Sequence, residues 1–214
     1  MKKIVLLVAA ALMLSACSKS PEEKANVLIK EHLQKTLYHP DKYDPAETVI
    51  DSAFSPADDP EFHQKLFDAY KLSVQISEIE DQIKKAKATM SIYQNNPFGD
   101  GYIRNQYDQA KEEYESLLAQ QEKLQEKGAK MKAEFDSMGK KFKKEGKKFI
   151  GFKASHKFRC QNNAGQTLFG NYYYLFDKDI TQILESLDID GDEYKTLQMM
   201  FDQIHEMAES EVEQ

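Results

Sequence analysis

His156 and Cys160 are a pair of side chains that could do chemistry together, because an imidazole and a thiol can act as base and nucleophile or share a metal ion. Both lie in residues 150–160, where apolar and polar residues alternate, so they should share one face of a β-strand. Four residues of strand separate their Cα atoms by roughly 13 Å, which is too far for a hydrogen bond or a common metal ion. We therefore interpret them as a buried histidine and a small buried thiol.

Carboxylates alternate at Asp188, Asp190 and Asp192, as in a calcium-binding loop. An EF-hand that begins at Asp188 needs glycine at its sixth position and glutamate at its twelfth, where this sequence has Glu193 and Met199. We therefore interpret the segment as the start of a helix, whose free N–H groups such carboxylates accept.

Asp202, His205 and Glu209 could present one nitrogen and two oxygens to zinc from a single helix. Acid-rich helix faces are usually solvated, and no second cluster completes the coordination shell. The sequence also lacks a P-loop, a Gly-x-Ser-x-Gly turn, a dinucleotide fingerprint, His-Glu-x-x-His and paired zinc-type cysteines. We predict no catalytic residue, no metal site and no cofactor.

Basic residues concentrate in one stretch that only Glu145 interrupts. Its members are Lys140, Lys141, Lys143, Lys144, Lys147, Lys148, Lys153, Lys157 and Arg159. The first six are a candidate surface for lipid head groups, lipopolysaccharide phosphate or an acidic partner. The alternative is a solvated helix end, where lysines complement the negative pole of the dipole, although nine basic residues exceed what a dipole needs.

The N-terminus has the layout of a secretory signal, with a basic start at Lys2 and Lys3, an apolar segment over residues 4–14 and small residues before Cys17. About a dozen apolar residues are too few for a retained spanning helix, which needs roughly 20. An ordinary signal peptide remains an alternative, but ordinary cleavage does not need the cysteine. Leu14-Ser15-Ala16-Cys17 resembles a lipobox, which implies that Cys17 is diacylated and begins the mature chain. The following residue, Ser18, is similar to the outer-membrane class, on either the periplasmic side or the cell surface.

The chain has 214 residues and a net charge of −7, and removal of a signal that contains two lysines makes it more acidic. A net acidic protein gains nothing from approaching nucleic acid unless its charge is locally segregated, so we expect nucleic acid to be a poor partner and predict none. If Cys17 is acylated, Cys160 has no cysteine to pair with inside the chain.

Two long segments predict helices with a coiled-coil seam, because apolar residues recur at alternating steps of four and three. The first seam is Leu72, Ile76, Ile79, Ile83, Ala86, Met90 and Tyr93. The second is Ile103, Tyr107, Ala110, Tyr114, Leu117, Leu124, Met131, Phe135, Met138 and Phe142, with Gln121 and Gly128 as breaks. Residues 95–101 contain proline and glycines and should turn the chain back, so we expect an antiparallel hairpin with arms of roughly 35 and 43 residues.

The other segments predict a small base. Ser20-Pro21-Glu22-Glu23 is a capping box that should start a helix, and residues 47–54 suggest a strand. Residues 150–160 and 167–176 suggest two more strands, and we expect helices from Asp177 or Asp179 through Leu187 and after Asp190.

The predicted fold class is α+β and mostly α: a long antiparallel coiled-coil helical hairpin that projects from a small base with about three antiparallel strands and flanking helices. The predicted organisation is a lipoprotein signal peptide over 1–16, the N-terminal helix and strand of the base over 17–57, the hairpin over 58–145, and a β-hairpin with C-terminal helices that complete the base over 146–214.

Short stretches over residues 37–45 (Leu-Tyr-His-Pro-Asp-Lys-Tyr-Asp-Pro), 156–162 (His-Lys-Phe-Arg-Cys-Gln-Asn) and 175–177 (Leu-Phe-Asp) are similar to a group of uncharacterised Bacteroidota-type lipoproteins. The resemblance covers most of the mature chain. It implies the lipid anchor and the envelope location, and it implies no activity.

Two functions fit these patterns. In the first, a lipid-anchored cell-envelope protein without catalysis has a structural or protein-interaction role through its hairpin arm, with the membrane and an envelope protein as partners and no small-molecule substrate. In the second, a periplasmic holdase or adaptor grips client polypeptides with the arm. The continuous, self-satisfied seam favours the first, and an enzyme of a kind that short motifs do not reveal comes third.

Overall fold

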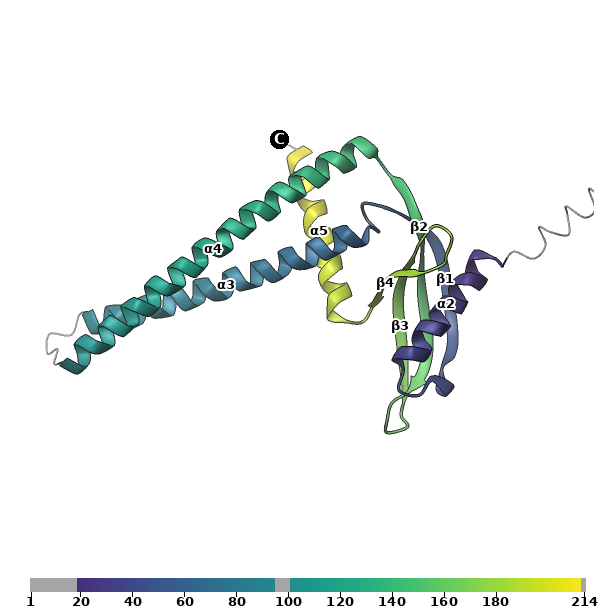
Figure 1. Cartoon of the computed structure of the whole chain (residues 1–214), viewed down its shortest axis with the longest axis horizontal. Coiled ribbons are helices and arrows are strands. Elements are labelled where there is room, and N and C mark those ends of the chain that lie inside the picture. The colour runs from purple at the N-terminus through teal and green to yellow at the C-terminus, as the bar shows by residue number, and fades with distance from the viewer. Residues whose placement is uncertain (1–18, 95–100, 213–214) are drawn as a thin grey trace, which may run out of the picture. The chain divides into compact units, whose positions relative to one another are not determined.

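The computed structural model describes residues 19–94 and 101–212, with side chains as far as residue 204 (Figure 1). The chain is of mixed α+β class and forms two compact units. The sheet unit contains the described residues up to Pro60 together with Lys147–Lys195. The helical unit contains Glu61–Gly146 and the residues from Thr196 onward. Cys17 lies outside the described residues.

A four-stranded antiparallel sheet forms the sheet unit, in the order β1-β2-β3-β4 (Figure 1). The strands are β1 (Asp44–Ser55), β2 (Lys148–Gln161), β3 (Thr167–Phe176) and β4 (Ile183–Asp188). The alternation in β2 is confirmed, since Ala154, His156, Phe158 and Cys160 are buried on one face. The expected number of about three strands is wrong by one.

The predicted helix from Asp177 or Asp179 through Leu187 is wrong, because this segment is a turn followed by β4. The Asp177 carboxylate accepts the backbone N–H groups of Thr181 and Gln182, at 2.6 and 3.1 Å, and so closes a loop instead of capping a helix. Ile180 has a φ of 52°, which a right-handed helix does not allow.

One helix, α2 (Pro21–Thr36), packs on a face of the sheet. Its predicted capping box is confirmed: the Ser20 hydroxyl accepts the Glu23 N–H at 3.1 Å, and the Glu23 carboxylate accepts the Ser20 N–H at 2.9 Å. The buried residues of the helix then share one core with the sheet. This core contains Ala25, Ile29, Leu33, Ala154, Phe158, Cys160, Tyr174, Phe176 and Ile180.

The helical unit contains two long helices, α3 (Pro60–Gln94) with 35 residues and α4 (Gly101–Glu145) with 45 residues, and most of α5 (Asp192–Val212). In α3 from Leu72 onward, every seam position that the sequence predicts is buried or half-buried, and every other residue is exposed. The same holds for the predicted seam of α4, including Gln121 and Gly128, with Gln106 as one further half-buried residue. The four-and-three spacing therefore predicted the sheltered face of each helix.

Contacts near the start of α3 show that the two helices run antiparallel there. The Phe62 ring lies 6.0 Å from the Phe135 ring and 5.5 Å from the Phe142 ring, centroid to centroid. Farther along, Lys65 Nζ contacts a Glu134 carboxylate oxygen at 2.6 Å. As residue numbers rise in α3, those of its partners in α4 fall.

The last helix also packs in the helical unit, although the sequence suggested that residues 146–214 complete the base. Phe201 lies 6.0 Å from Phe62 and 5.7 Å from His63, ring centroid to ring centroid. The apolar stripe of α5 therefore covers the aromatic side chains at the start of α3. Leu197 of α5 is buried as well.

We expect Gly128→Ala to raise the free energy of unfolding by up to about 1 kcal/mol, because alanine has the higher helix propensity. A Cβ at this position would lie 4.0 Å from Leu72 Cδ2, an ordinary van der Waals contact. Chemical denaturation measures the change, and a loss of stability would show that the two helices pack more tightly at Gly128 than this distance indicates.

Candidate functional site

One buried polar group of the sheet unit is His156, which is fully buried. Its Nε2 lies 2.9 Å from the Tyr43 hydroxyl and its Nδ1 lies 2.9 Å from Thr48 Oγ1. Thr48 in turn donates its hydroxyl proton to Asn26 Oδ1 at 2.7 Å. This donation assigns the proton of the ring to Nδ1, so that Nδ1 donates to Thr48 and Nε2 accepts from Tyr43.

The hydrogen-bond chain makes His156 a structural group. Burial lowers the pKa of His156 to about 4, so the ring is neutral near pH 7. Neither nitrogen is open to a substrate, which a general base requires. Through Asn26, Thr48 and Tyr43 the ring joins α2 to β1 and β2.

His156 and Cys160 do not form a pair, as their strand spacing predicted. Phe158 lies between them on the same face, and its ring stacks on His156 with centroids 5.6 Å apart. Burial raises the pKa of the Cys160 thiol, which keeps the sulfur protonated and weakly reactive.

The Tyr174 hydroxyl is buried and has no hydrogen-bond partner among the described residues. Burial raises its pKa, because the charged phenolate is disfavoured away from water. We expect Tyr174→Phe to leave the free energy of unfolding unchanged or to raise it by about 1 kcal/mol, since an unsatisfied buried hydroxyl costs free energy. Thermal and chemical denaturation test this, and a loss above about 1 kcal/mol would mean that the hydroxyl has a partner after all.

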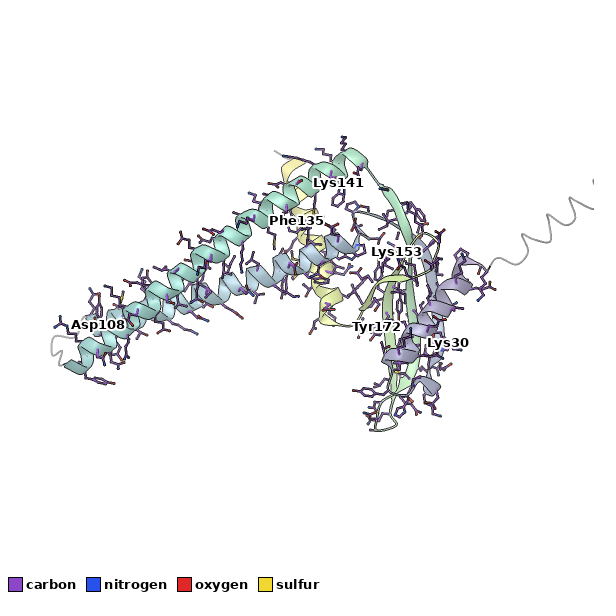
Figure 2. All side chains as sticks on the ribbon, viewed as in Figure 1. Lys30, Asp108, Phe135, Lys141, Lys153 and Tyr172 are labelled. Atoms are coloured by element: carbon purple, nitrogen blue, oxygen red, sulfur yellow. The ribbon has the colours of Figure 1, made fainter. Side chains whose placement is uncertain are left out.

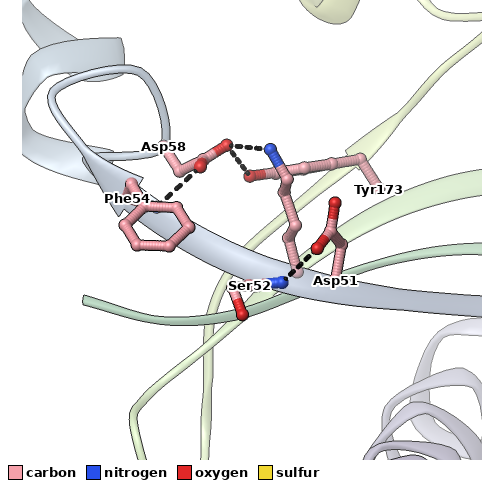
Figure 3. Close-up of polar contacts among 6 residues, drawn as sticks. Asp51, Ser52, Phe54, Asp58 and Tyr173 are labelled. Atoms are coloured by element: carbon pink, nitrogen blue, oxygen red, sulfur yellow. Dashed lines mark hydrogen bonds and ion pairs between the residues drawn. The ribbon is translucent and has the colours of Figure 1, made fainter. Parts of the chain in front are cut away.

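A second buried polar cluster centres on Asp58, which is 7% exposed. One carboxylate oxygen accepts the Phe54 N–H at 2.8 Å, and the other contacts Lys153 Nζ at 2.8 Å and the Tyr173 hydroxyl at 3.5 Å (Figure 3). Burial, with the Asp58 charge nearby, raises the pKa of Tyr173. α3 begins at Pro60, and Asp58 ties the β1–α3 connection to the sheet through Phe54, Lys153 and Tyr173.

The structure divides the basic stretch into two groups. Three members form ion pairs with acids of the sheet unit: Lys153 with Asp58 at 2.8 Å, Lys157 with Glu47 at 2.9 Å and Arg159 with Asp44 at 3.7 Å. A neighbouring carboxylate therefore offsets the positive charge of each of these three side chains.

The other six lysines are all exposed. Lys140, Lys141, Lys143 and Lys144 lie in the last two turns of α4, where Figure 2 labels Lys141. Lys147 and Lys148 follow in the sheet unit, where Lys147 Nζ lies 4.2 Å from the centre of the Phe54 ring. Within the described ranges, none of the six forms an ion pair with an acid.

Of the carboxylates that suggested calcium, Asp188 ends β4, Asp190 lies in the turn that follows, and Asp192 begins α5, as the helix-start interpretation predicted. Asp188 accepts the backbone N–H of Asp190 at 3.0 Å, which closes the turn before the helix. Of the candidate zinc ligands, Asp202 is exposed, and the side chains of His205 and Glu209 lie outside the described residues. Where side chains are described, no three His, Cys, Asp or Glu residues come together to hold a metal ion.

The helical unit carries an open groove of about 330 Å³ between α3 and α4. Leu72 and Met131 supply apolar surface, and charged or polar side chains surround them. The lining residues are Asp68, Lys71, Leu72, Gln75, Lys127, Lys130, Met131 and Glu134. Such a groove can accept an apolar side chain of a partner, and it holds no set of groups suited to catalysis.

No protein-family model, curated protein or solved structure matches this chain. Its function must therefore be argued from its own residues. No helix in the described part of the chain is both long enough and apolar enough to cross a bilayer.

Sequence reasoning identified His156 as buried but missed its partners Tyr43, Thr48 and Asn26. One of them, Thr48, lies opposite His156 in the β1–β2 register, so the register would have identified this partner. That register follows from folding and is not visible in the separate segments. The groove was also missed, since no local pattern marks a place where two helices leave space.

Proposed function

We propose that this chain is a non-enzymatic, lipid-anchored cell-envelope protein of the outer membrane, held by an acylated Cys17. In this proposal α3 and α4 form an antiparallel coiled-coil hairpin along their whole length, and this arm docks another envelope protein. The short stretches at residues 37–45, 156–162 and 175–177, which resemble uncharacterised Bacteroidota-type lipoproteins, support this location.

The observation that carries the proposal is the pattern of exposure in α3 and α4. From Leu72 onward in α3 and throughout α4, each helix shelters one stripe at alternating steps of four and three residues and exposes almost everything else. Helices of 35 and 45 residues are roughly 50 to 65 Å long. A pair of helices with this exposure buries only one narrow stripe per helix. Its large polar surface suits an extended element that reaches a partner.

Exposed apolar side chains near the turn between the two helices supply a docking surface. Ile92 is 69% exposed and Tyr102 is 66% exposed, although both belong to types that are usually sheltered. They flank the connection at the end of α3 and the start of α4. We therefore expect the partner to contact this end of the helices.

The start of α2 supports the anchor. Ser20 caps a helix that begins at Pro21, so only Ser18 and Lys19 separate Cys17 from the cap. A chain held by an acyl group at Cys17 would therefore keep its sheet unit near the membrane surface.

The polar groups of the sheet unit favour a non-enzymatic role. The buried imidazole of His156 and the buried carboxylate of Asp58 both bond to neighbouring side chains of the same unit. These bonds fix the sheet and its connections, and they leave neither group poised toward an open cleft.

Photocrosslinking in intact cells tests the docking. A photoreactive amino acid at Ile92 should capture one specific envelope protein. The same amino acid at Phe169, which is 81% exposed in the sheet unit, is the matched control and should not capture it. A mixed population of unfolded clients at Ile92 would favour a holdase instead, and capture of nothing would contradict docking at this end.

Spin labels test the coiled coil. Labels on Lys85→Cys in α3 and Glu115→Cys in α4 should give one narrow distance of roughly 20–30 Å, because packed helices lie about 10 Å apart axis to axis. Both positions are exposed, so the labels should not disturb the seam. A broad distribution at much longer distances would contradict the hairpin.

A further inference from the structure

Four lysines form a continuous exposed face at the C-terminal end of α4, and we call Lys140, Lys141, Lys143 and Lys144 the lysine face. An α-helix turns by about 100° per residue, which places Lys140, Lys143 and Lys144 on the side opposite the sheltered positions Met138 and Phe142 and Lys141 at the flank of that side. The lysine face therefore points away from the seam of the helix.

The lysine face has no acidic partner in the described structure. The acids nearest in the helix, Asp136 and Glu145, are exposed and form no ion pair with it. This contrasts with Lys153, Lys157 and Arg159, each of which contacts a carboxylate. The lysine face is thus a concentration of positive charge in a chain whose net charge is −7.

The helix dipole explains only part of this charge. Lys143 and Lys144 lie in the last turn, where cations complement the free carbonyl groups. Lys140 and Lys141 lie one turn earlier, and Lys147 and Lys148 follow the end of the helix in the chain. The effect of the dipole falls off within one turn, so it does not account for Lys140, Lys141 and Lys148, whereas Lys147 lies over the Phe54 ring.

The side-chain types indicate the kind of partner. Protein interfaces are depleted in lysine and rely on arginine and aromatic anchors, but the basic residues of this surface are all lysines, and Phe142 is turned to the sheltered side. An array of lysines without anchors suits a surface of many diffuse negative charges, such as anionic lipid head groups. The groove of the helical unit, which could select a small ligand, is lined by other residues.

We propose that the lysine face binds the anionic surface of a lipid bilayer. The binding is electrostatic and needs no acyl group, so it would bring the end of α4 to a membrane whether or not Cys17 is acylated. It goes beyond the proposed function by giving the helical unit a membrane contact of its own.

Vesicle sedimentation tests this inference with the full mature chain, residues 17–214, carrying Cys17→Ser so that no lipid obscures the result. The chain should bind vesicles made of two parts phosphatidylcholine and one part phosphatidylglycerol, and it should not bind phosphatidylcholine alone. Reversal of the lysine face to glutamate (K140E, K141E, K143E and K144E) should weaken binding on the order of 100-fold, because each lysine near an anionic surface contributes about fivefold or less. Added salt should weaken the binding of the unmodified face.

A matched control reverses four other exposed lysines of α3 and α4: Lys85, Lys87, Lys123 and Lys132. It has the same net charge as the first variant and should retain most of the binding. Circular dichroism of both variants should show unchanged helix content. Equal loss in the two variants, or no preference of the unmodified chain for the anionic vesicles, would overturn the proposal. Neither result depends on lipidation of Cys17 or on capture of a partner at Ile92.

Discussion

Replacement of His156 by alanine should lower the free energy of unfolding by about 3 kcal/mol or more. The ring is fully buried, so its removal leaves a cavity, and it also leaves the hydroxyl groups of Tyr43 and Thr48 without their shared partner. Chemical denaturation, followed by circular dichroism, measures the loss.

His39→Ala is the control for this change. His39 is half-buried, and no bond to its ring holds two elements together in the described structure. The control should change the free energy of unfolding by less than about 1 kcal/mol. If both variants lose the same amount, the network around His156 does not stabilise the sheet unit.

The burial of His156 also predicts how the free energy of unfolding depends on pH. The pKa of His156 is about 4 in the folded chain, below the 6.5 of an unperturbed histidine. Between these two values the unfolded chain binds a proton that the folded chain does not, so stability must fall as pH falls from 6.5 to 4. The loss should approach about 3 kcal/mol in total, and the contribution of His156 is complete above pH 6.5.

A comparison of variants isolates this titration. Burial also lowers the pKa of His32, which therefore adds to the slope in the same direction. His156→Gln keeps most of the volume but cannot titrate, so its stability should fall less steeply with pH than that of the natural chain. Parallel curves for the two chains would contradict the assignment of a neutral, buried His156.

Gly151→Ala should cost at least about 3 kcal/mol and could prevent folding of the sheet unit. A Cβ at this position would lie 2.0 Å from the Phe176 carbonyl oxygen and 3.0 Å from the Asp177 carbonyl carbon. Both are backbone atoms at the end of β3, so no rotation of a side chain relieves the clash. Gly151 also lies at the irregularity of the β1–β2 register, beside Ala53.

Gly139→Ala is the matched control in a different environment. A Cβ there meets nothing within 4 Å, and Gly139 lies inside α4, so alanine should stabilise the chain by up to about 1 kcal/mol. The yield of folded protein and the denaturation midpoint measure both changes. A Gly151→Ala variant with natural stability would show that the end of β3 can move away from β2.

Local patterns predicted the elements whose side chains have a strict period. The alternation from Ile150 to Cys160 predicted β2, and the four-and-three spacing predicted the sheltered faces of α3 and α4. These predictions worked because burial on one face imposes a period of two on strands and of 3.6 on helices.

The predicted helix from Asp177 or Asp179 is wrong because an aspartate can either cap a helix or close a turn. An aspartate before an apolar segment is typical of a helix N-cap, but its carboxylate equally closes a turn, as it does with Thr181 and Gln182. The pairing of β4 with β3 decides between them, and that pairing depends on residues far apart in the sequence.

The polar sites were predictable only in part, for a related reason. A histidine on the apolar face of a strand is predictably buried, but its partners Tyr43 and Thr48 come from residues more than one hundred positions away. The contacts of Asp58 with Lys153 and Tyr173 likewise depend on the folded sheet.

Metabolic labelling with a fatty-acid analogue tests the proposed anchor most directly. Cells that express the full chain should incorporate the label into the protein, and the protein should fractionate with the outer membrane. Cys17→Ala should abolish both the label and the membrane association, while Cys160→Ala should leave both unchanged. Absence of label from the natural chain, or label that persists in Cys17→Ala, would contradict a lipid-anchored envelope protein.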